Sequence, residues 1–427
     1  MEPAGNRSWP ARLACRGAQR YRRPMRRRAP IPAGWRPARA AAPILAALCG
    51  CDSACALFAP RNHPAATAPA EVTSGPWLLD PGPTEMTVAW TTAQPGKGRV
   101  WYLADRLAQE ETARTDHRLT LRALPADTEV HYRIEAALPI AGTFRTAPGA
   151  QTPFRVLVYG DNRTNSGDHA LVARAAEAEG VQLALHTGDM VVNAADAQLW
   201  SRWFAEERDL LLRTPFVPTL GNHEITDNGV AYSRYFQGPD RPAYRSLDYG
   251  PVHLVVLDSF ERAAGADPHT GAISDAQKAW VEEDLRTVPA DKHVWVLVHQ
   301  GPHAHPARMR PGHGGSERVR AAILAAARRH PIEAVFAGHE HFYERGEIDG
   351  LRYFVLGGGG APLEDPDATF PGVASAKKAL SFVTLEVCGC HVAGKAKDIA
   401  GRVFDSFTLS DCKEPCGAPV AAKGGTP

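Results

Sequence analysis

The chain has 427 residues, a length that suggests two to three domains. Hydrophobic residues make up 44% and charged residues 22%, which is ordinary globular usage and excludes a disordered chain, a coiled coil and a polytopic membrane protein. The 38 glycines and 35 prolines predict many loops and few long helices. The formal net charge of +1 is the sum of two segments with opposite net charges.

The N-terminal segment, residues 1–55, has the composition of an export leader. Eleven arginines and one acidic residue give residues 1–40 a net charge of +10, so the rest of the chain is near −9. A short apolar run follows, as in signal peptides. Leu48-Cys-Gly-Cys51 resembles a lipobox, which predicts a lipid tether on Cys51; cleavage near Ala54 without a lipid is the alternative.

We therefore expect an exported protein in the periplasm, at the cell surface or outside the cell. A basic nucleic-acid-binding arm is the rival interpretation of the arginines. The apolar run directly after them has no use in such an arm, so no nucleic-acid partner is expected.

All eight cysteines lie outside residues 56–387. Four lie in the leader, and the others are Cys388, Cys390, Cys412 and Cys416. In an exported chain these four predict two disulfides that tie down the C-terminal tail, residues 412–427. A small structural zinc site is the alternative.

Residues 56–74 are rich in Ala, Pro and Thr, which is typical of a flexible linker. Residues 75–148 then predict a small β-sandwich. Its expected strands lie at 87–92, 98–103, 117–121, 130–136 and 142–146. The Leu-Pro turn and the strand after it resemble fibronectin type III domains, which implies that Tyr132 is buried. No catalytic constellation is found in this segment.

Residues 149–411 repeat one construction: an apolar strand followed by a polar residue. The strands are expected at 154–159, 181–186, 214–220, 252–257, 293–298 and 332–336, with helices at 168–179, 196–212, 274–286 and 316–330 between them. Strands that are apolar throughout are buried on both faces, which predicts a layered α/β fold. Ligand sites in such folds gather at the carboxyl ends of the strands.

The strand ends supply the side chains Asp161, Asp189, Asn222, His299, His339 and His341. Two Asp, one Asn and three His suit two divalent or trivalent metal ions with mixed oxygen and nitrogen ligands. Asp258 also follows a strand but fits no ligand position, so we expect it to be structural.

The motif Gly338-His-Glu-His-Phe-Tyr-Glu-Arg345 resembles the purple acid phosphatase-like branch of the calcineurin-like metallophosphoesterases. The resemblance covers about residues 72–410. It implies an α/β four-layer β-sandwich metallophosphoesterase domain preceded by a small all-β fibronectin type III-like sandwich. It also implies a phosphoric ester hydrolase with two metal ions, which are iron, zinc or manganese.

The resemblance further assigns roles to single residues. Asp189 would bridge the two metals. Asp161 and His341 would bind the first, and Asn222, His299 and His339 the second. His223 would donate a proton to the leaving group during in-line attack by a metal-bound hydroxide. The residues expected to orient the ligating histidines are Glu224, Tyr343, Glu344 and Arg345.

Two positions depart from the family pattern. Val192 stands where the branch has a Tyr ligand, and Arg163 stands where the wider superfamily has Asp-x-His. The first metal therefore lacks a ligand, and water, Asn193 or another side chain are the alternatives for it. Arg163 is expected either to bind a phosphate oxygen or to form an ion pair. His303 is the histidine expected to contact substrate from its loop.

We expect a phosphomonoesterase that acts on a small phosphorylated substrate. A phosphodiesterase or nucleotide hydrolase of the same superfamily is the alternative enzyme. The alternative from another class is a non-catalytic surface-binding protein with a degenerate site.

Overall fold

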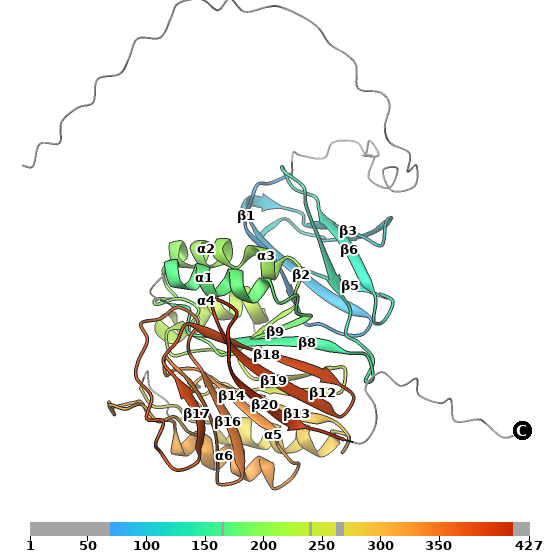
Figure 1. Ribbon diagram of the computed structural model, residues 1–427. Coiled ribbons are helices and arrows are strands. Elements are labelled where there is room, and N and C mark those ends of the chain that lie inside the picture. The colour runs from blue at the N-terminus through green and yellow to red at the C-terminus, as the bar shows by residue number, and fades with distance from the viewer. Residues whose placement is uncertain (1–68, 164–165, 239–240, 262–268, 413–427) are drawn as a thin grey trace, which may run out of the picture. The chain divides into compact units, whose positions relative to one another are not determined.

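The computed structural model describes residues 69–163, 166–238, 241–261 and 269–412 (Figure 1). The predicted export leader with Cys51, most of the predicted linker and the tail after residue 412 lie outside these ranges. Among the described helices, none has the length and apolar character needed to cross a membrane.

The first described domain is a sandwich of two antiparallel sheets. One sheet has the order β1-β2-β5, formed by Val72–Leu79, Glu85–Gly96 and Arg114–Arg122. The other has the order β4-β3-β6-β7, formed by Arg106–Gln109, Arg99–Tyr102, Glu129–Ile134 and Ile140–Arg145. The sequence predicted five of these strands and missed β1 and β4. β4 has four partly exposed or exposed residues, so it carries little apolar alternation to reveal it.

Tyr132 on β6 is buried, as the fibronectin-like pattern implied. Its hydroxyl donates a hydrogen bond to the carbonyl oxygen of Leu212 at 2.9 Å. Trp77 on β1 makes a second connection to the following domain. Its ring stacks on Phe204 at 4.5 Å, and its Nε1 donates to the carbonyl of Tyr235 at 2.9 Å.

The second domain contains two larger mixed sheets. The first has the order β10-β9-β8-β18-β19-β20, formed by Phe216–Pro218, Leu183–His186, Phe154–Tyr159, Ser381–Cys388, His391–Asp398 and Val403–Ser410. The second has the order β11-β12-β13-β14-β16-β15-β17, formed by Arg245–Tyr249, Val252–Val256, His293–Leu297, Ala334–Ala337, Leu351–Leu356, Tyr343–Ile348 and Val373–Lys377. The parallel strands are β8, β9 and β10 in one sheet and β12, β13, β14 and β16 in the other.

These two sheets pack face to face through a shared apolar core. Val158 and Leu185 from the first sheet meet Trp295 and Phe336 from the second. Helices α1 (Ser166–Glu177), α2 (Ala197–Glu206) and α3 (Arg208–Leu211) cover the outer face of the first sheet. Helices α5 (Asp275–Thr287) and α6 (Glu317–Ala327) cover the second (Figure 1). The expected four-layer α/β fold is therefore confirmed.

The predicted helix at 196–212 divides into α2 and α3 at Glu207. The buried Glu207 carboxylate accepts hydrogen bonds from the hydroxyl of Tyr159 and from the ring of His169, both at 2.7 Å. After β10 the chain forms a 3-10 turn at Glu224–Asp227, the short α4 (Val230–Tyr232) and a π-helical turn at Ser233–Gln237.

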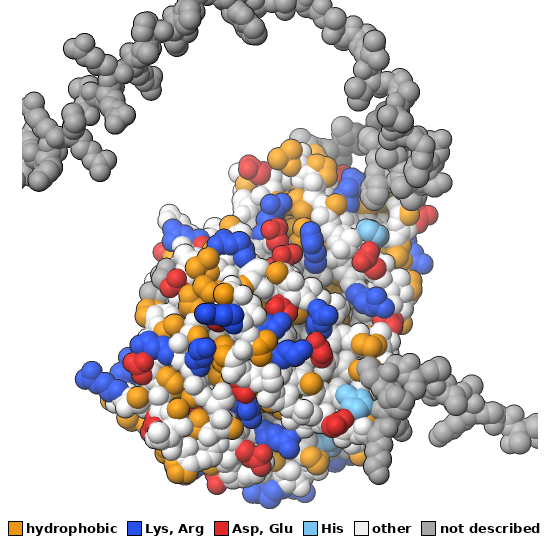
Figure 2. Space-filling view, in the orientation of Figure 1, with side chains coloured by type: hydrophobic (Ala, Val, Ile, Leu, Met, Phe, Trp, Pro, Cys, Tyr) orange, Lys and Arg blue, Asp and Glu red, His pale blue; other side chains and the backbone are white. Residues whose placement is uncertain are grey.

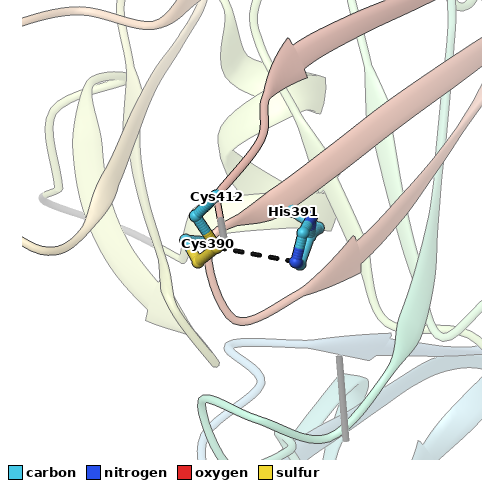
Figure 3. A group of neighbouring side chains, drawn as sticks. All are labelled: Cys390, His391 and Cys412. Carbon is cyan, nitrogen blue, oxygen red and sulfur yellow. Dashed lines mark hydrogen bonds between the residues drawn. A yellow bond between two sulfur atoms is a disulfide. The ribbon is translucent and has the colours of Figure 1, made fainter. Parts of the chain in front are cut away.

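A disulfide joins Cys390 to Cys412 and ties the end of β20 to the β18–β19 hairpin (Figure 3). Cys388 is also disulfide-bonded. His391 lies beside this pair, with its Nε2 3.5 Å from Cys412 Sγ. The structure thus favours the disulfide interpretation, because oxidised sulfurs are not free to bind zinc.

Acidic and basic side chains are interspersed on the face of the molecule drawn in Figure 2. The charge of this face is therefore mixed.

Candidate metal centre

Three strand ends of the second domain hold polar residues in an uncommon backbone conformation. Asp161, Asp189 and His339 have φ angles of 58°, 58° and 73°. Residues other than glycine seldom adopt positive φ, and such residues cluster at functional sites. Glycines precede all three. A Cβ on Gly338 would collide with Asp161 Oδ2 and with Thr187, so the close approach of two strand ends requires glycine there.

Four polar atoms converge beside these turns. Asn222 Oδ1 lies 3.1 Å from His299 Nε2 and 3.0 Å from His339 Nδ1. The two ring nitrogens are 3.3 Å apart, and His299 Nε2 is 3.4 Å from Asp189 Oδ1. Tetrahedral ligands about 2.0–2.2 Å from a metal would be about 3.3–3.6 Å apart. The spacing of this set, which we call the second-site donors, therefore fits one metal ion.

The hydrogen bonds of the two histidines show which nitrogen faces this centre. His299 Nδ1 donates to the carbonyl of Thr187 at 2.6 Å, and His339 Nε2 donates to the carbonyl of Gly312 at 3.0 Å. In the neutral form of each imidazole the remaining nitrogen carries a lone pair, and this nitrogen lies 3.1 Å (His299) or 3.0 Å (His339) from Asn222 Oδ1. Lone pairs that face one another are stabilised by a cation. The chemistry of the donors thus agrees with their spacing.

The pKa values of His299 and His339 also favour a cation among these donors. Burial opposes a charge on His299, but the adjacent Asp189 carboxylate outweighs burial and raises the pKa of His299 to about 9. Burial, together with the nearby His299, lowers the pKa of His339 to about 3. Without a metal, His299 thus holds a proton beside Asp189. A bound metal ion would replace that proton.

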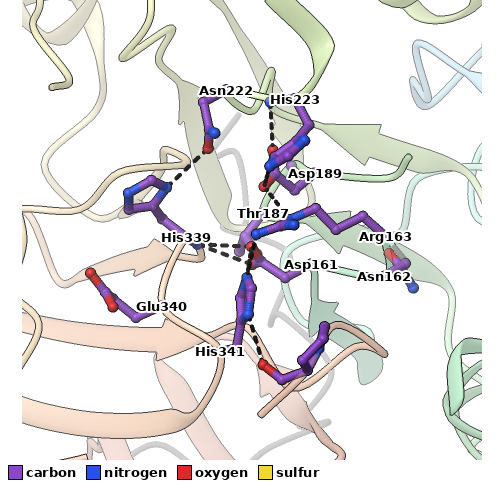
Figure 4. Close-up of polar contacts among 12 residues, drawn as sticks. Asp161, Asn162, Arg163, Thr187, Asp189, Asn222, His223, His339, Glu340 and His341 are labelled. Atoms are coloured by element: carbon purple, nitrogen blue, oxygen red, sulfur yellow. Dashed lines mark hydrogen bonds and ion pairs between the residues drawn. The ribbon is translucent and has the colours of Figure 1, made fainter. Parts of the chain in front are cut away.

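The donors expected for the first metal have a different environment. His341 Nε2 lies 3.7 Å from Asp161 Oδ1, and its Nδ1 donates to the carbonyl of Pro362 at 2.9 Å. Arg163 reaches the same place: its Nε is 3.0 Å from Asp189 Oδ2, and its Nη2 donates to His341 Nε2 at 3.0 Å (Figure 4). A guanidinium therefore contacts donors that a metal would need, and this half of the centre fits a metal poorly.

His223 lies at the edge of the centre. Its Nδ1 donates to the carbonyl of Val192 at 2.7 Å, and its Nε2 is 3.9 Å from Asp189 Oδ2. The side chain is 22% exposed, so the ring is partly open to solvent. The structure thus brings His223 to the six predicted ligands.

Glu224 is buried beneath the same loops. Its carboxylate accepts backbone N–H groups of Asp189 at 2.8 Å, Gly221 at 2.9 Å and Met190 at 2.9 Å. Burial and the nearby Asp189 raise the pKa of Glu224 to about 7. Glu224 therefore positions the Asp189 turn and does not orient a ligating histidine, which is the role that the family resemblance had implied for it.

The other three residues expected to orient histidines have their contacts elsewhere. The Tyr343 hydroxyl donates to Asp405 at 2.6 Å, and Arg345 pairs with the same carboxylate at 2.8 Å. Glu344 bonds the ring of His305 at 2.8 Å. These contacts join β15 to β20 and to the 303–305 loop, so they brace the fold around the centre.

Asn193 does not replace the missing ligand. Its side-chain oxygen accepts from Ala195 N at 3.1 Å and from the hydroxyl of Thr226 at 3.2 Å, and the residue is exposed. Val192, at the family's Tyr position, is 37% exposed. The Asn193 side-chain oxygen is thus occupied by Ala195 and Thr226, and the structure does not support Asn193 as a metal ligand.

His303 also lies away from the donors. Its buried ring packs on Tyr353 at 5.2 Å and on His305 at 6.4 Å. The histidine beside the centre is His313, whose ring stacks on His339 at 5.2 Å and bonds Glu340 at 3.0 Å. The sequence predicted His303 for the contact with substrate, but which histidine of this loop lies beside the centre depends on the path of the loop.

The family comparison gives a direct identification of this region. Residues 154–343 match the family model described as calcineurin-like phosphoesterase. This region is a calcineurin-like phosphoesterase domain. The matched range contains all six candidate ligands and His223.

Several proteins resemble the chain that carries this phosphoesterase domain. An uncharacterized protein of Mycobacterium tuberculosis is 27% identical over 317 residues, which are 61% of this chain and 59% of that protein. A phosphoenolpyruvate phosphatase of Allium cepa is 25% identical and aligns with 66% of this chain and 64% of its own length. The chain thus spans about three fifths of the length of these relatives.

Among solved structures, a purple acid phosphatase from yellow lupin (Lupinus luteus) seeds has the same fold as the chain. It superposes with a TM-score of 0.65 at 18% identity, over 80% of this chain and 74% of the lupin chain. The likeness extends beyond the phosphoesterase domain, so the arrangement of a sandwich followed by a four-layer domain is purple acid phosphatase-like.

Proposed function

We propose that the protein is a metal-dependent phosphatase that hydrolyses phosphomonoesters. The observation that carries this proposal is the convergence of Asp189, Asn222, His299 and His339 at the spacing of ligands around one metal ion. Relatives named as phosphoenolpyruvate phosphatase and purple acid phosphatase support a phosphate ester as the substrate.

The second-site donors would hold a metal through oxygen and imidazole, a set that suits iron, zinc or manganese. The family resemblance implies a second ion near Asp161 and His341. A metal in such a centre polarises the phosphate and makes water a stronger nucleophile near neutral pH. The remaining tasks of the reaction fall to residues of the chain.

Hydrolysis of a phosphomonoester forms one phosphorus–oxygen bond to water and breaks the bond to the alcohol. The departing alkoxide then needs a proton. We infer that His223 supplies it. Its Nδ1 donates to the Val192 carbonyl, and its Nε2 lies 3.9 Å from Asp189 Oδ2, which supports this role. Proton donation by a positioned side chain is typically worth about 10²–10⁴-fold in rate.

Asp189 needs a fixed position for this chemistry, because it lies between both halves of the centre. The Oδ1 of Asp189 accepts the backbone N–H of His223 at 3.0 Å. The backbone N–H of Asp189 donates to the Glu224 carboxylate. Arg163 adds positive charge at Oδ2. These contacts orient the carboxylate before a substrate arrives.

The test uses p-nitrophenyl phosphate and bis(p-nitrophenyl) phosphate with the purified chain after chelation and after metal addition. We expect metal-restored release of nitrophenol, faster from the monoester. His299→Ala should abolish it, whereas the control His131→Ala, which changes an exposed strand histidine, should retain it. Equal activity of the His299→Ala and wild-type chains would refute the proposal; a faster diester would assign the phosphodiesterase alternative.

We further propose that the chain is exported. The leader composition supports this, and a disulfide at Cys390–Cys412 suits an oxidising compartment. Mass spectrometry of the mature N-terminus would test both export and the lipid on Cys51, and an intact Met1 would contradict them.

A further inference from the structure

Arg163 lies among the donors that the family resemblance assigns to the first metal. Its Nε is 3.0 Å from Asp189 Oδ2, and its Nη2 donates to His341 Nε2 at 3.0 Å (Figure 4). A metal bound by these two atoms would be about 2.0–2.2 Å from each. Guanidinium nitrogens already fill that space. The Arg163 side chain is only 19% exposed, so it is enclosed in the centre.

The acceptor nitrogen of His341 already takes part in a hydrogen bond. Its Nδ1 donates to the Pro362 carbonyl, so Nε2 is the acceptor nitrogen, and Arg163 Nη2 donates to it. A metal could bind His341 only after Arg163 leaves. In contrast, His299 Nε2 and His339 Nδ1 both lie beside an acceptor, Asn222 Oδ1, and not beside a guanidinium.

Among the described residues, the positions at which related sites carry the remaining ligand of the first metal do not supply one. Val192 has no donor atom in its side chain, and its carbonyl accepts from His223. Asn193 is exposed and bonds Thr226. The position that would carry a His ligand in Asp-x-His is Arg163 itself. A cation thus stands where related sites have a ligand.

We propose that the Arg163 guanidinium replaces the first metal ion, so that the chain binds a single metal ion at the second-site donors. This inference rests on the proposed metal-dependent function. Arg163 supplies the second positive charge of the centre, and its planar fork suits a phosphate oxygen better than a point charge does. Arg163 would therefore contact substrate, with Asp189 and His341 holding it in place.

Metal stoichiometry tests this inference without measuring activity. The chelated chain is loaded with excess Mn²⁺ alone, desalted, and analysed for Mn²⁺ per chain and by electron paramagnetic resonance. We expect one Mn²⁺ per wild-type chain with the spectrum of an isolated ion. Arg163→His creates the Asp-x-His ligand pattern and should bind two, with a magnetically coupled spectrum.

Two ligand variants provide matched controls. His341→Ala should still bind one Mn²⁺, because His341 holds Arg163 in this arrangement. His339→Ala should bind none after desalting. If Arg163→His does not fold, the comparison of the wild-type and His341→Ala chains decides the question, with cooperative thermal unfolding showing that each is folded.

Two Mn²⁺ per wild-type chain, or a fall from two to one in His341→Ala, would overturn the inference and leave the proposed function intact. A wild-type chain that binds no Mn²⁺ and no Zn²⁺ would overturn both the inference and the proposed function.

Discussion

His299 Nδ1 donates a hydrogen bond to the carbonyl oxygen of Thr187 at 2.6 Å. Thr187 follows β9 and His299 follows β13, so this bond connects the two large sheets at the metal centre. It fixes the ring so that Nε2 faces Asn222 and Asp189. Hydrogen bonds of this kind determine which nitrogen can bind a metal.

Metal removal should therefore lower the stability of the whole chain. Three of the second-site donors, Asp189, His299 and His339, are buried. A ligand that binds only the folded chain at 100 times its dissociation constant adds about 2.7 kcal/mol. We expect a lower melting temperature after chelation and its recovery with Zn²⁺. The His299→Ala chain should show no such recovery, and equal melting of the chelated and loaded wild-type chains would contradict the expectation.

Glu224→Gln should weaken metal binding although Glu224 is not a ligand. The carboxylate accepts backbone N–H groups of Asp189, Met190 and Gly221, and an amide can accept fewer of them. Loss of a residue that positions a ligand typically costs about 10–100-fold in metal affinity or activity. Calorimetric titration with Zn²⁺ measures this. The control is Glu317→Gln at the exposed start of α6, which should bind as the wild-type chain does.

Stability should fall on the alkaline side of neutrality because of His169. Burial opposes charge on this ring, but hydrogen bonds to Glu206 and Glu207 outweigh burial and raise the pKa of His169 to about 9. An unfolded histidine titrates near about 6.5. The stabilisation is therefore complete below about pH 6.5 and is lost as the pH rises through about 9.

Urea unfolding at a series of pH values measures this dependence. The His169→Ala chain leaves the two carboxylates without their cation, so we expect a loss of about 3–5 kcal/mol near neutral pH, where the carboxylates are ionised, and a flatter alkaline slope. An unchanged slope would show that other groups cause the decline; His253, whose pKa is also raised to about 9 by Asp248 and Asp284 against burial, is the next one to replace.

Trp77→Ala should separate the β-sandwich from the phosphoesterase domain. The ring is buried, stacks on Phe204 and donates to the Tyr235 carbonyl. Replacing a buried Trp by Ala typically costs about 3–5 kcal/mol. We expect a lower melting temperature with two transitions in calorimetry. Leu138→Ala, a control at an 82% exposed site, should melt as the wild-type chain does.

The sequence alone was sufficient to predict the layered fold and the strand ends at which the six candidate ligands lie. Strands such as 154–159 and 293–298 are apolar throughout, and the carboxyl ends of parallel strands meet at one edge of a sheet. Asp161, Asp189 and His299 therefore had to approach one another once the strands paired. β1 was missed because its sequence contains Gly75-Pro76, which is typical of a loop.

The tertiary structure decided what each side chain contacts. The carbonyls of Thr187, Gly312 and Pro362 set the orientation of the histidine rings, and backbone atoms carry no residue-specific signal in the sequence. The path of one loop placed His313 at the centre. Arg163 likewise lies between two donors because of its side-chain conformation. The sequence shows which residues follow a strand, but the direction of each side chain depends on its rotamer and on the residues that pack around it.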